Sequence, residues 1–436
     1  MFRIHPLVTL LLACMTFASL AQAQSTFGTI MGVVKDPGGL VIPGAKVTLS
    51  SLEDRSARDI VSDPNGAFQF MNVKAGHYEI EVHAEGFGVF KLTSVQLDAR
   101  QTLRTDLSLK VASTSETIEV GDTAPMINTE SATLADTKDF VQVSQLPVNY
   151  RGATTSSLAV LATVPGTQQD ANGNVSIGGG LPSQVQYSVD GASTVNIRQN
   201  GALANMNPSS ELIAEFKVSQ FNNNAEFSQL GDITIATKSG TEHYHGSLFE
   251  YLQNSMLDAT TFGFPSKPHK TFNTFGGSFG GPLKIPGLME GGSHTFFFAA
   301  YEGNRRRLVT PLFLNVPTSA MRAGNLKGLS AANGAPIVDP FTGQPFPNDK
   351  IPSCGQPGCL NPVALSLLAN YYTALPNSTS QGANYLQQAS TPSNTDGYDI
   401  RIDHTLTVKQ SLYGRWSSKN ISSTIPNALL PSDSDH

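Results

Sequence analysis

Hydrophobic and polar residues alternate with a period of two along the first part of the chain. The apolar positions form four groups: Val47 and Leu49; Phe68 and Phe70; Tyr78, Ile80 and Val82; and Leu103, Leu107 and Leu109. Turn signals separate them at Asp36-Pro37-Gly38-Gly39, Asp63-Pro64-Asn65-Gly66 and Glu85-Gly86. Short alternating strands divided by such turns are typical of a β-sandwich, which we predict between Thr26 and Val111. His77 and His83 fall within this pattern and are expected at the surface or in the sandwich, not as ligands.

A second series of strand-like runs lies between Val175 and Leu257. Its β-branched and aromatic segments are cut by Gly-rich and Asp-Gly turns. The pattern predicts strands and hairpins, with Asp190-Gly191 at the turn of a hairpin over Val175 to Ser193. Upstream, Thr137 to Gln145 is predicted to form a short helix that stops before Pro147, because proline disfavours helical backbone in the residue before it.

The strictest alternation begins at Tyr398. One face of this segment carries Tyr398, Ile400, Ile402, His404, Leu406 and Val408, and the other carries Asp399, Arg401, Asp403, Thr405, Thr407 and Lys409. A barrel strand with one face in lipid and one towards the lumen requires a mostly apolar face and a polar face. A soluble sheet produces the same alternation, so the pattern alone leaves both environments open.

Composition favours turn-rich β structure and several domains. The chain has 436 residues with 39 Gly and 26 Pro, and only 14% of its residues are charged. This length exceeds one ordinary domain. The net charge of −6 provides no electrostatic footprint for nucleic acid. The one basic run, Arg305 to Arg307, is short and is expected at a solvated strand end or turn.

The N-terminus has the features of a secretory signal peptide, predicted over residues 1–23. Arg3 supplies a positive charge, Leu7 to Leu20 an apolar core, and Ala21 and Ala23 an A-x-A cleavage site. No other segment has the length and hydropathy of a membrane-spanning helix. Insertion into a membrane would therefore require a closed β-barrel.

Cys354 and Cys359 remain after removal of the signal peptide, with a C-x4-C spacing across Gly and Pro. An even pair in an exported chain predicts a small loop-closing disulfide. No His or second Cys pair lies nearby, so a metal site is not expected there. We expect no cofactor and no metal elsewhere, because His243 and His245 supply too few ligands.

The chain shows no catalytic constellation, and we expect it not to be an enzyme. Gly276 to Gly280 fits the G-x-S-x-G pattern of hydrolases, which requires a strand, a sharp turn and a helix. Pro282 and the surrounding glycines argue against a helix there.

Longer phrases resemble a known family. GTIMGVVKDPGGLVIPGAKVTL, SDPNGAFQFMNVKAGHYEIEVHAEGF and LRTDLSL resemble the carboxypeptidase regulatory-like domain, a carbohydrate-binding-like fold. The phrase ITIATKSGT and the order of the phrases before it resemble the plug domain of TonB-dependent outer-membrane receptors of the Oar-like family. One departure is Gly231-Asp232, where relatives usually have two glycines, which predicts a different local turn.

The resemblance implies a mainly β protein with three parts. These are the β-sandwich over residues 26–111, an α+β plug domain over 124–240, and the first strands of an incomplete outer-membrane β-barrel over 241–436. The barrel part would include a long external loop at about 311–394 with a short helix over Ala364 to Leu375. Tyr251, Phe272, Phe275 and Tyr301 would suit an aromatic girdle.

The resemblance also implies a function, which is energised uptake through the outer membrane without cofactor or chemistry. TonB would pair by strand addition with a segment of the linker over residues 112–123, at Glu116, Thr117, Ile118, Glu119 and Val120; a plain interdomain linker is the alternative. Substrate contacts would include Gly178, Gly179, Gly180, Leu181, Pro182 and Ser183. A vitamin, siderophore, oligosaccharide or peptide would each fit as substrate, with sandwich and plug on the periplasmic side.

Two further expectations concern the barrel and the rival function. Plugged transporters have about 22 strands, and far fewer strand candidates follow Gly240. An open sheet in lipid leaves unpaired backbone groups that each cost several kcal/mol, so we expect a truncated or split gene product. The rival is a secreted or periplasmic module that binds carbohydrate or peptide without transport.

Overall fold

The computed structural model describes residues 26–111, 118–121, 130–145, 157–170, 174–198, 201–223, 229–260, 262, 267–284, 294–329, 334–353, 359–379, 382–407, 410–426 and 434–435. The predicted signal peptide with Ala21 and Ala23 lies outside these residues, as do Glu116, Thr117 and Cys354. Among the described residues, no helix is long and apolar enough to cross a membrane.

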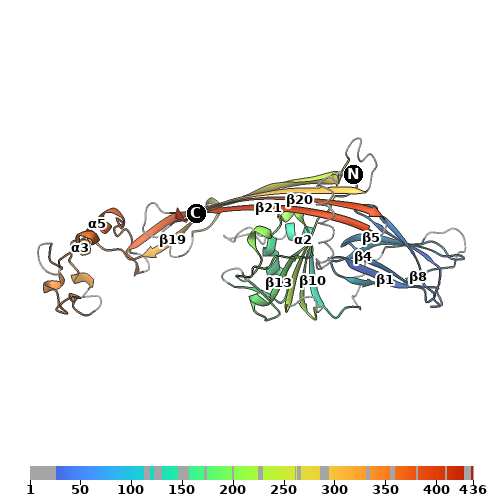
Figure 1. Cartoon of the computed structure of the whole chain (residues 1–436), viewed down its shortest axis with the longest axis horizontal. Coiled ribbons are helices and arrows are strands. Elements are labelled where there is room, and N and C mark those ends of the chain that lie inside the picture. The colour runs from blue at the N-terminus through green and yellow to red at the C-terminus, as the bar shows by residue number, and fades with distance from the viewer. Residues whose placement is uncertain are drawn as a thin grey trace, which may run out of the picture. The chain divides into compact units, whose positions relative to one another are not determined.

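The chain divides into two compact units. The first comprises Met1–Phe249, Phe275–Glu302 and Asp396–Asn420, and the second Glu250–Thr274, Gly303–Thr395 and Ile421–His436. The first unit contains a β-sandwich, a second α+β domain and parts of five long strands, shown as a ribbon in Figure 1.

The N-terminal residues form the predicted β-sandwich. In one sheet, β1 (Gly28–Lys35) pairs with β4 (Ala67–Val73), β7 (Thr102–Arg104) and β8 (Leu107–Ser108). The other sheet has the order β3 (Ala57–Val61), β2 (Lys46–Ser51), β5 (Gly76–His83), β6 (Phe90–Leu97) and β9 (Ile118–Gly121). Every apolar position of the four groups singled out above is buried in one core, and His77 and His83 are exposed.

A turn that the sequence predicts shows how these strands are positioned. At Asp63 to Gly66, the Asp63 carboxylate accepts hydrogen bonds from the amides of Asn65 and Ala67, both at 2.8 Å. Gly66 adopts φ +71°, a left-handed conformation that glycine adopts without steric penalty. Strand β4 begins directly after this turn, and its Phe68 and Phe70 side chains are buried in the sandwich core.

The following residues, 130–240, form what we call the central domain. Its sheet has the order β10 (Leu134–Asp139), β15 (Ile213–Phe221), β16 (Gly231–Thr237), β13 (Val185–Val189) and β14 (Ala192–Ser193), and β11 (Thr167–Gln169) pairs separately with β12 (Val175–Ile177). All pairings are antiparallel except β13 with β16. The helices are α2 (Phe140–Gln145) and the short 3₁₀ helices η1 (Ser157–Thr163), η2 (Pro182–Gln184), η3 (Ala204–Met206) and η4 (Ser210–Leu212).

The hairpin predicted over Val175 to Ser193 and the helix predicted over Thr137 to Gln145 are both present, but each is shorter than predicted. The Asp190-Gly191 turn joins β13 to β14, with φ values of +49° and +84°, while β12 pairs with β11 and not within this hairpin. The helix begins at Phe140 and not at Thr137, because residues up to Asp139 pair with β15 as part of β10. The Asp139 carboxylate then accepts the amide of Gln142 at 2.8 Å and caps the helix.

The prediction of an altered turn at Gly231-Asp232 is wrong. Both residues lie in strand β16, paired with Val185 and Gln186 of β13. Asp232 needs no left-handed backbone there, and its side chain is 1% exposed. A charged side chain this deeply buried requires a partner, which the neighbouring sandwich supplies.

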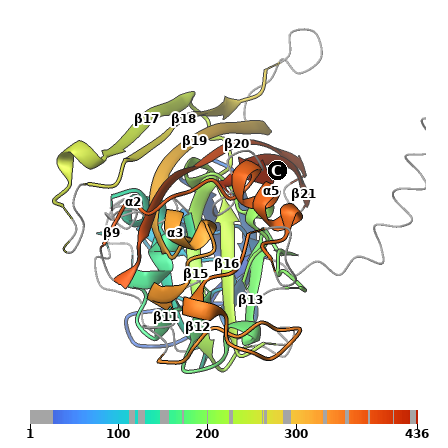
Figure 2. The ribbon, with the colours of Figure 1, turned by 90° about the vertical axis from the view of Figure 1, so that its left-hand side faces the viewer.

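Five long strands follow in chain order and pair as neighbours in one sheet, which we call the strand wall. They are β17 (His245–Asn254), β18 (Lys270–Pro282), β19 (Thr295–Leu314), β20 (Tyr385–Thr407) and β21 (Gln410–Ser423), with the 3₁₀ helix η5 (Ser255–Leu257) after β17. Figure 2 shows them succeeding one another along an arc. Gly276 to Gly280 lies within β18, so the G-x-S-x-G pattern is not at a strand-to-helix turn.

The second unit contains the connection between β19 and β20, which is shorter than predicted. It runs over residues 315–384 and not 311–394, because both strands extend further than their sequence pattern indicates. It contains α3 (Ser319–Arg322), η6 (Pro347–Asp349) and α5 (Pro362–Asn370), and the chain ends with β22 (Ile425–Pro426) and β23 (Ser434–Asp435). Helix α5 begins two residues before the predicted Ala364, where Asn361 caps the amide of Val363 at 2.8 Å, and ends before Leu375.

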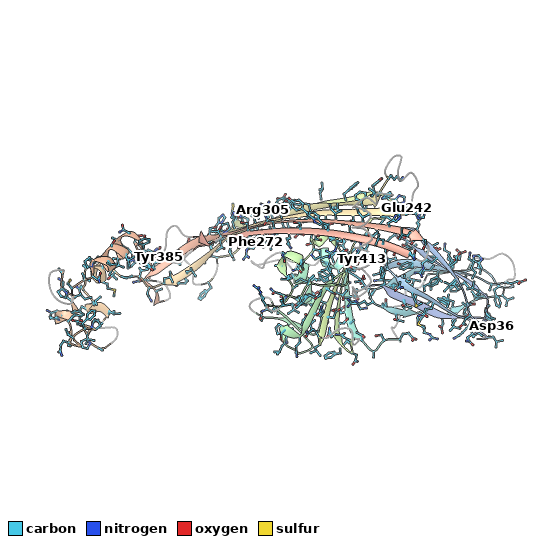
Figure 3. All side chains as sticks on the ribbon, viewed as in Figure 1. Asp36, Glu242, Phe272, Arg305, Tyr385 and Tyr413 are labelled. Carbon is cyan, nitrogen blue, oxygen red and sulfur yellow. The ribbon has the colours of Figure 1, made fainter. Side chains whose placement is uncertain are left out.

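The four residues predicted for an aromatic girdle differ in exposure, and the girdle itself stays a prediction. Tyr251 is 54% exposed, and the rings of Phe275, Tyr301 and Tyr398 follow one another across β18, β19 and β20 with centroids 6.2 and 5.0 Å apart. Phe272, labelled in Figure 3, is only 2% exposed, because the Arg306 guanidinium lies over its ring at 5.0 Å.

Candidate functional site

Strand β20 buries its polar face and exposes its apolar face. Asp399, Arg401 and Asp403 are 4%, 7% and 3% exposed, whereas Ile400 and Ile402 are 44% and 42% exposed. A soluble sheet buries the opposite face, because apolar surface is driven out of water. Of the two environments that the alternation left open, the structure therefore has the arrangement of a barrel strand with a polar lumen side.

Each strand of the wall directs a polar side chain at the central domain. The Ser247 hydroxyl of β17 donates to the Glu211 carboxylate at 2.6 Å, and the Ser278 hydroxyl of β18 donates to the same carboxylate at 3.2 Å. Glu302 of β19 accepts the amide of Ser210 at 2.9 Å. These contacts hold η4 against three neighbouring strands.

Strand β20 continues this polar contact through Asp399. Its carboxylate accepts both the hydroxyl of Ser209, at 2.7 Å, and the amide of Ser209, at 3.1 Å. The pair is buried, so each hydrogen bond replaces a water contact that neither group can make there. The central domain and the wall therefore meet through hydrogen-bonded polar groups, beside a small apolar cluster of Leu212 with Phe298 and Ala300.

The centre of the contact is an ion cluster around Asp190 and Arg401. Arg401 Nη1 donates to Asp190 Oδ1 at 3.2 Å and to the hydroxyl of Thr237 at 2.7 Å. Arg415 Nε donates to Asp190 Oδ2 at 3.0 Å, and the Tyr413 hydroxyl, on β21 in Figure 3, donates to the Asp190 carbonyl at 3.1 Å. Both carboxylate oxygens of Asp190 are thus paired with wall residues.

The cluster extends from Arg401 to the sandwich. Arg401 Nε and Nη2 donate to the two carboxylate oxygens of Asp403 at 2.8 and 3.0 Å, a bidentate arrangement. Asp403 Oδ1 also accepts Lys74 Nζ, from the sandwich, at 3.0 Å. The guanidinium of Arg401 lies 4.6 Å from the ring centre of Tyr413. The cluster thus contains side chains of the wall, the central domain and the sandwich.

Local sequence explains how Asp190 reaches this position. A two-residue turn of this hand requires positive φ at both residues, and Asp followed by Gly is a preferred pair for it. The turn projects the Asp190 carboxylate beside the end of β16, where the Thr237 amide donates to it at 2.9 Å. Sequence reasoning identified the turn and missed the ion cluster, because Arg401 lies 211 residues further along the chain.

A second polar junction joins the sandwich to the central domain. Arg100 Nη1 donates to Asp232 Oδ2 at 3.0 Å, and the pair is 12% and 1% exposed. The amide of Ala99 donates to Glu215 at 2.6 Å, and Lys217 Nζ donates to the Ala99 carbonyl at 2.6 Å. Burial raises the pKa of the Glu215 carboxyl to about 7, and burial lowers the pKa of Lys217.

The segment predicted to pair with TonB falls partly within the described residues. Ile118, Glu119 and Val120 belong to β9, whose backbone pairs in parallel with β6 of the sandwich. The pairs are Phe90 with Ile118, Lys91 with Glu119, Leu92 with Val120 and Thr93 with Gly121. The segment predicted as a linker therefore carries a strand of the sandwich sheet.

The predicted substrate-contact residues run from the end of β12 into η2 in the central domain and are partly buried and partly exposed. Gly178 and Gly179 adopt φ values of +59° and +78°, and Leu181 is 63% exposed. The Leu181 amide donates to Gln184 at 3.0 Å. Gly178 to Ser183 precede β13, whereas the Asp190 cluster lies at the turn that follows β13.

The described residues hold no group of three or more His, Cys, Asp and Glu side chains suited to a metal ion. His243 and His245 are exposed at the start of the wall. The disulfide between Cys354 and Cys359 stays a prediction, since Cys354 lies outside the described residues.

Comparisons with known proteins match two parts of the chain to family models. Residues 29–110 match the carboxypeptidase regulatory-like domain, and residues 236–435 match the outer membrane beta barrel domain. The chain is thus a mainly β protein that joins these two kinds of domain.

The chain is also similar in sequence to a known transporter. The chain is 27% identical over 282 residues to the TonB-dependent transporter Oar of Myxococcus xanthus, an alignment that covers 61% of this chain and 26% of that protein. The chain thus spans about a quarter of the length of this relative. The resemblance to Oar-like TonB-dependent receptors is confirmed by this match and by the two family models.

Solved structures are similar over small parts of the chain. A streptococcal ancillary pilin is 14% identical with a TM-score of 0.17, covering 20% of this chain and 33% of that one. Hydroxyquinol 1,2-dioxygenase from Pseudomonas putida is 12% identical with a TM-score of 0.18, covering 21% and 59%. Similarities this limited carry no argument about activity.

Proposed function

We propose that the chain acts in a TonB-dependent transporter of the outer membrane, in which the central domain is the plug of a β-barrel. The observation that carries this proposal is the inverted burial of β20, whose apolar face is exposed while Asp399, Arg401 and Asp403 are buried against the central domain. A lipid-facing strand around a polar plug has this arrangement. A soluble binding module would instead bury Ile400 and Ile402.

The match to Oar and to the outer membrane beta barrel domain supports the same proposal. The sandwich would lie on the periplasmic side, and TonB would pair with Glu116 to Val120, ahead of the central domain. Force applied there would act on a plug held by the Asp190 cluster. The loop Gly178 to Ser183 would contact the transported substrate.

Deletion of Glu116 to Val120 tests the proposal in the organism that produces the protein. Solutes that the wild type removes from a complex medium, and that a null mutant does not, define the uptake phenotype by mass spectrometry. The deletion variant is expected to reach the outer membrane and to reproduce the null phenotype. A strain without TonB should share it, since strand addition to this segment is the energy input.

The matched control exchanges Glu116 and Glu119 for Gln, which keeps the backbone that strand addition uses. This variant is expected to retain most uptake. Wild-type uptake by the deletion variant would contradict the assignment of the segment. A null mutant without any uptake defect, or a chain recovered only in the soluble periplasm, would contradict transport itself.

A further inference from the structure

The sandwich has an edge at which its sheet can be extended. The order β3, β2, β5, β6, β9 makes β9 the last strand of this sheet. Backbone groups of a strand point alternately to its two sides, so pairing with β6 satisfies one side of β9 only. Among the described residues, no strand pairs with the other side. Such an edge is a template for a strand of another chain.

The chain is held at this edge by contacts that precede β9. Phe87 and Val111 form an isolated bridge, and the Gly88 amide donates to the Lys110 carbonyl at 2.9 Å. The chain therefore leaves the sandwich core beside the start of β6. Phe90 then pairs with Ile118 and Thr93 with Gly121, which holds four residues of β9 in one register. Figure 2 labels the resulting strand.

We propose that the sandwich presents β9 to TonB as a preformed strand, so that TonB adds its own strand to the outer edge of the sheet β3-β2-β5-β6-β9. This inference rests on the proposed function, because it takes Glu116 to Val120 as the TonB-pairing segment. It gives the sandwich a role of its own. The sandwich is then part of the TonB-binding surface and not only a domain that precedes it.

Binding of TonB to β9 while β9 stays paired with β6 is favoured over release of β9 into solvent, because β9 is already ordered as a strand. A free segment must give up backbone freedom when it becomes a strand, whereas β9 already has extended backbone in the sheet. Release would also expose the edge of β6, whose amides and carbonyls would lose their partners. The full chain is therefore expected to bind TonB more tightly than the isolated segment does.

A disulfide between β6 and β9 tests the proposal directly. Lys91 and Glu119 are paired in the register, so cysteines at both positions point to the same face of the sheet. The variant Lys91→Cys/Glu119→Cys, with Cys354→Ser and Cys359→Ser, fixes β9 on β6 when oxidised. The control Lys91→Cys/Val120→Cys places its cysteines on opposite faces and should not join them.

The probe is the purified periplasmic domain of TonB from the producing organism, added to the full-length chain in detergent. The oxidised variant is expected to bind it at least as tightly as the reduced variant. A synthetic peptide of residues 113–123 should bind at least about tenfold more weakly than the chain, because it lacks the preformed strand.

The other outcomes separate the inference from the function on which it rests. Binding by the peptide and the reduced variant, with loss of binding on oxidation, would show that β9 must be released and would overturn the inference alone. Failure of the cysteines at positions 91 and 119 to join in the folded chain would overturn it too. Absence of binding by both peptide and chain would overturn the TonB assignment together with the inference.

Discussion

Arg401→Met is expected to lower the free energy of opening of the central domain by about 3 kcal/mol or more. The guanidinium donates to Asp190, Thr237 and Asp403 while it is only 7% exposed. Methionine fills a similar volume and donates nothing. Two carboxylates would then remain buried with fewer partners, and an incompletely paired buried charge is costly. Arg415 and Lys74 stay in place and limit the loss.

Hydrogen exchange on the full-length chain in detergent measures this effect. The amide of Thr237 reports on the cluster because it donates to Asp190. Arg198→Met is the matched control, since Arg198 is exposed, and it should change the free energy by about 0.5 kcal/mol or less. Adding Asp403→Leu to Arg401→Met should recover part of the loss. Equal exchange in Arg401→Met and wild type would show that the cluster does not hold the central domain.

The junction between sandwich and central domain is expected to weaken as pH rises. Burial raises the pKa of the Glu215 carboxyl to about 7 from a usual value of 4.5, so the folded chain binds this proton more tightly than the unfolded chain does. The stabilisation is complete below about pH 4.5 and is lost as pH rises to about 7. The full loss corresponds to about 3 kcal/mol.

Glu215→Gln removes the titrating group and keeps an oxygen that can accept the Ala99 amide. Hydrogen exchange of the β15 amides is measured in the full-length chain and corrected for the intrinsic exchange rate. In the wild type, this corrected rate should fall when the pH is lowered from 8 to 5. The Gln variant should lack this part of the change. An identical pH dependence in both proteins would rule out Glu215 as its source.

The sequence was sufficient for the parts of the fold that depend on local pattern. Alternation of apolar residues with polar ones located the sandwich core from Val47 to Leu109, and the Asp-Gly pair located the β13–β14 turn. The same pattern at Tyr398 to Thr407 predicted two faces without saying which would be buried. That choice depends on what covers the strand, and here the central domain covers the polar face.

Features that depend on distant partners were not predictable from local pattern. Asp190 and Asp232 lie in a turn and in a strand, and their roles follow from Arg401 and Arg100, which are far away in the chain. Asp232 was interpreted as a turn residue because relatives have glycine there, whereas its carboxylate pairs with the sandwich. Likewise, nothing in Ile118 to Val120 indicates a parallel partner in β6. These long-range contacts create the candidate site.

If the outer face of the strand wall lies in lipid, as proposed, the protein contains its own reporter of that environment. Trp416 is the single tryptophan of the chain and lies on β21 with 57% of its surface exposed. It stands next to Arg415, which points to Asp190, so Trp416 points away from the central domain. Its fluorescence therefore reports on the environment of the outer face.

The measurement is the fluorescence of the full-length protein in phospholipid vesicles with and without brominated acyl chains. The fluorescence of Trp416 is expected to be strongly quenched by the brominated lipid. In the variant Trp416→Phe/Met71→Trp, the tryptophan reports from the exposed surface of the sandwich and should not be quenched. Emission from Trp416 that is unchanged by brominated lipid and quenched by iodide in the water phase would show that this face of β21 does not lie in lipid.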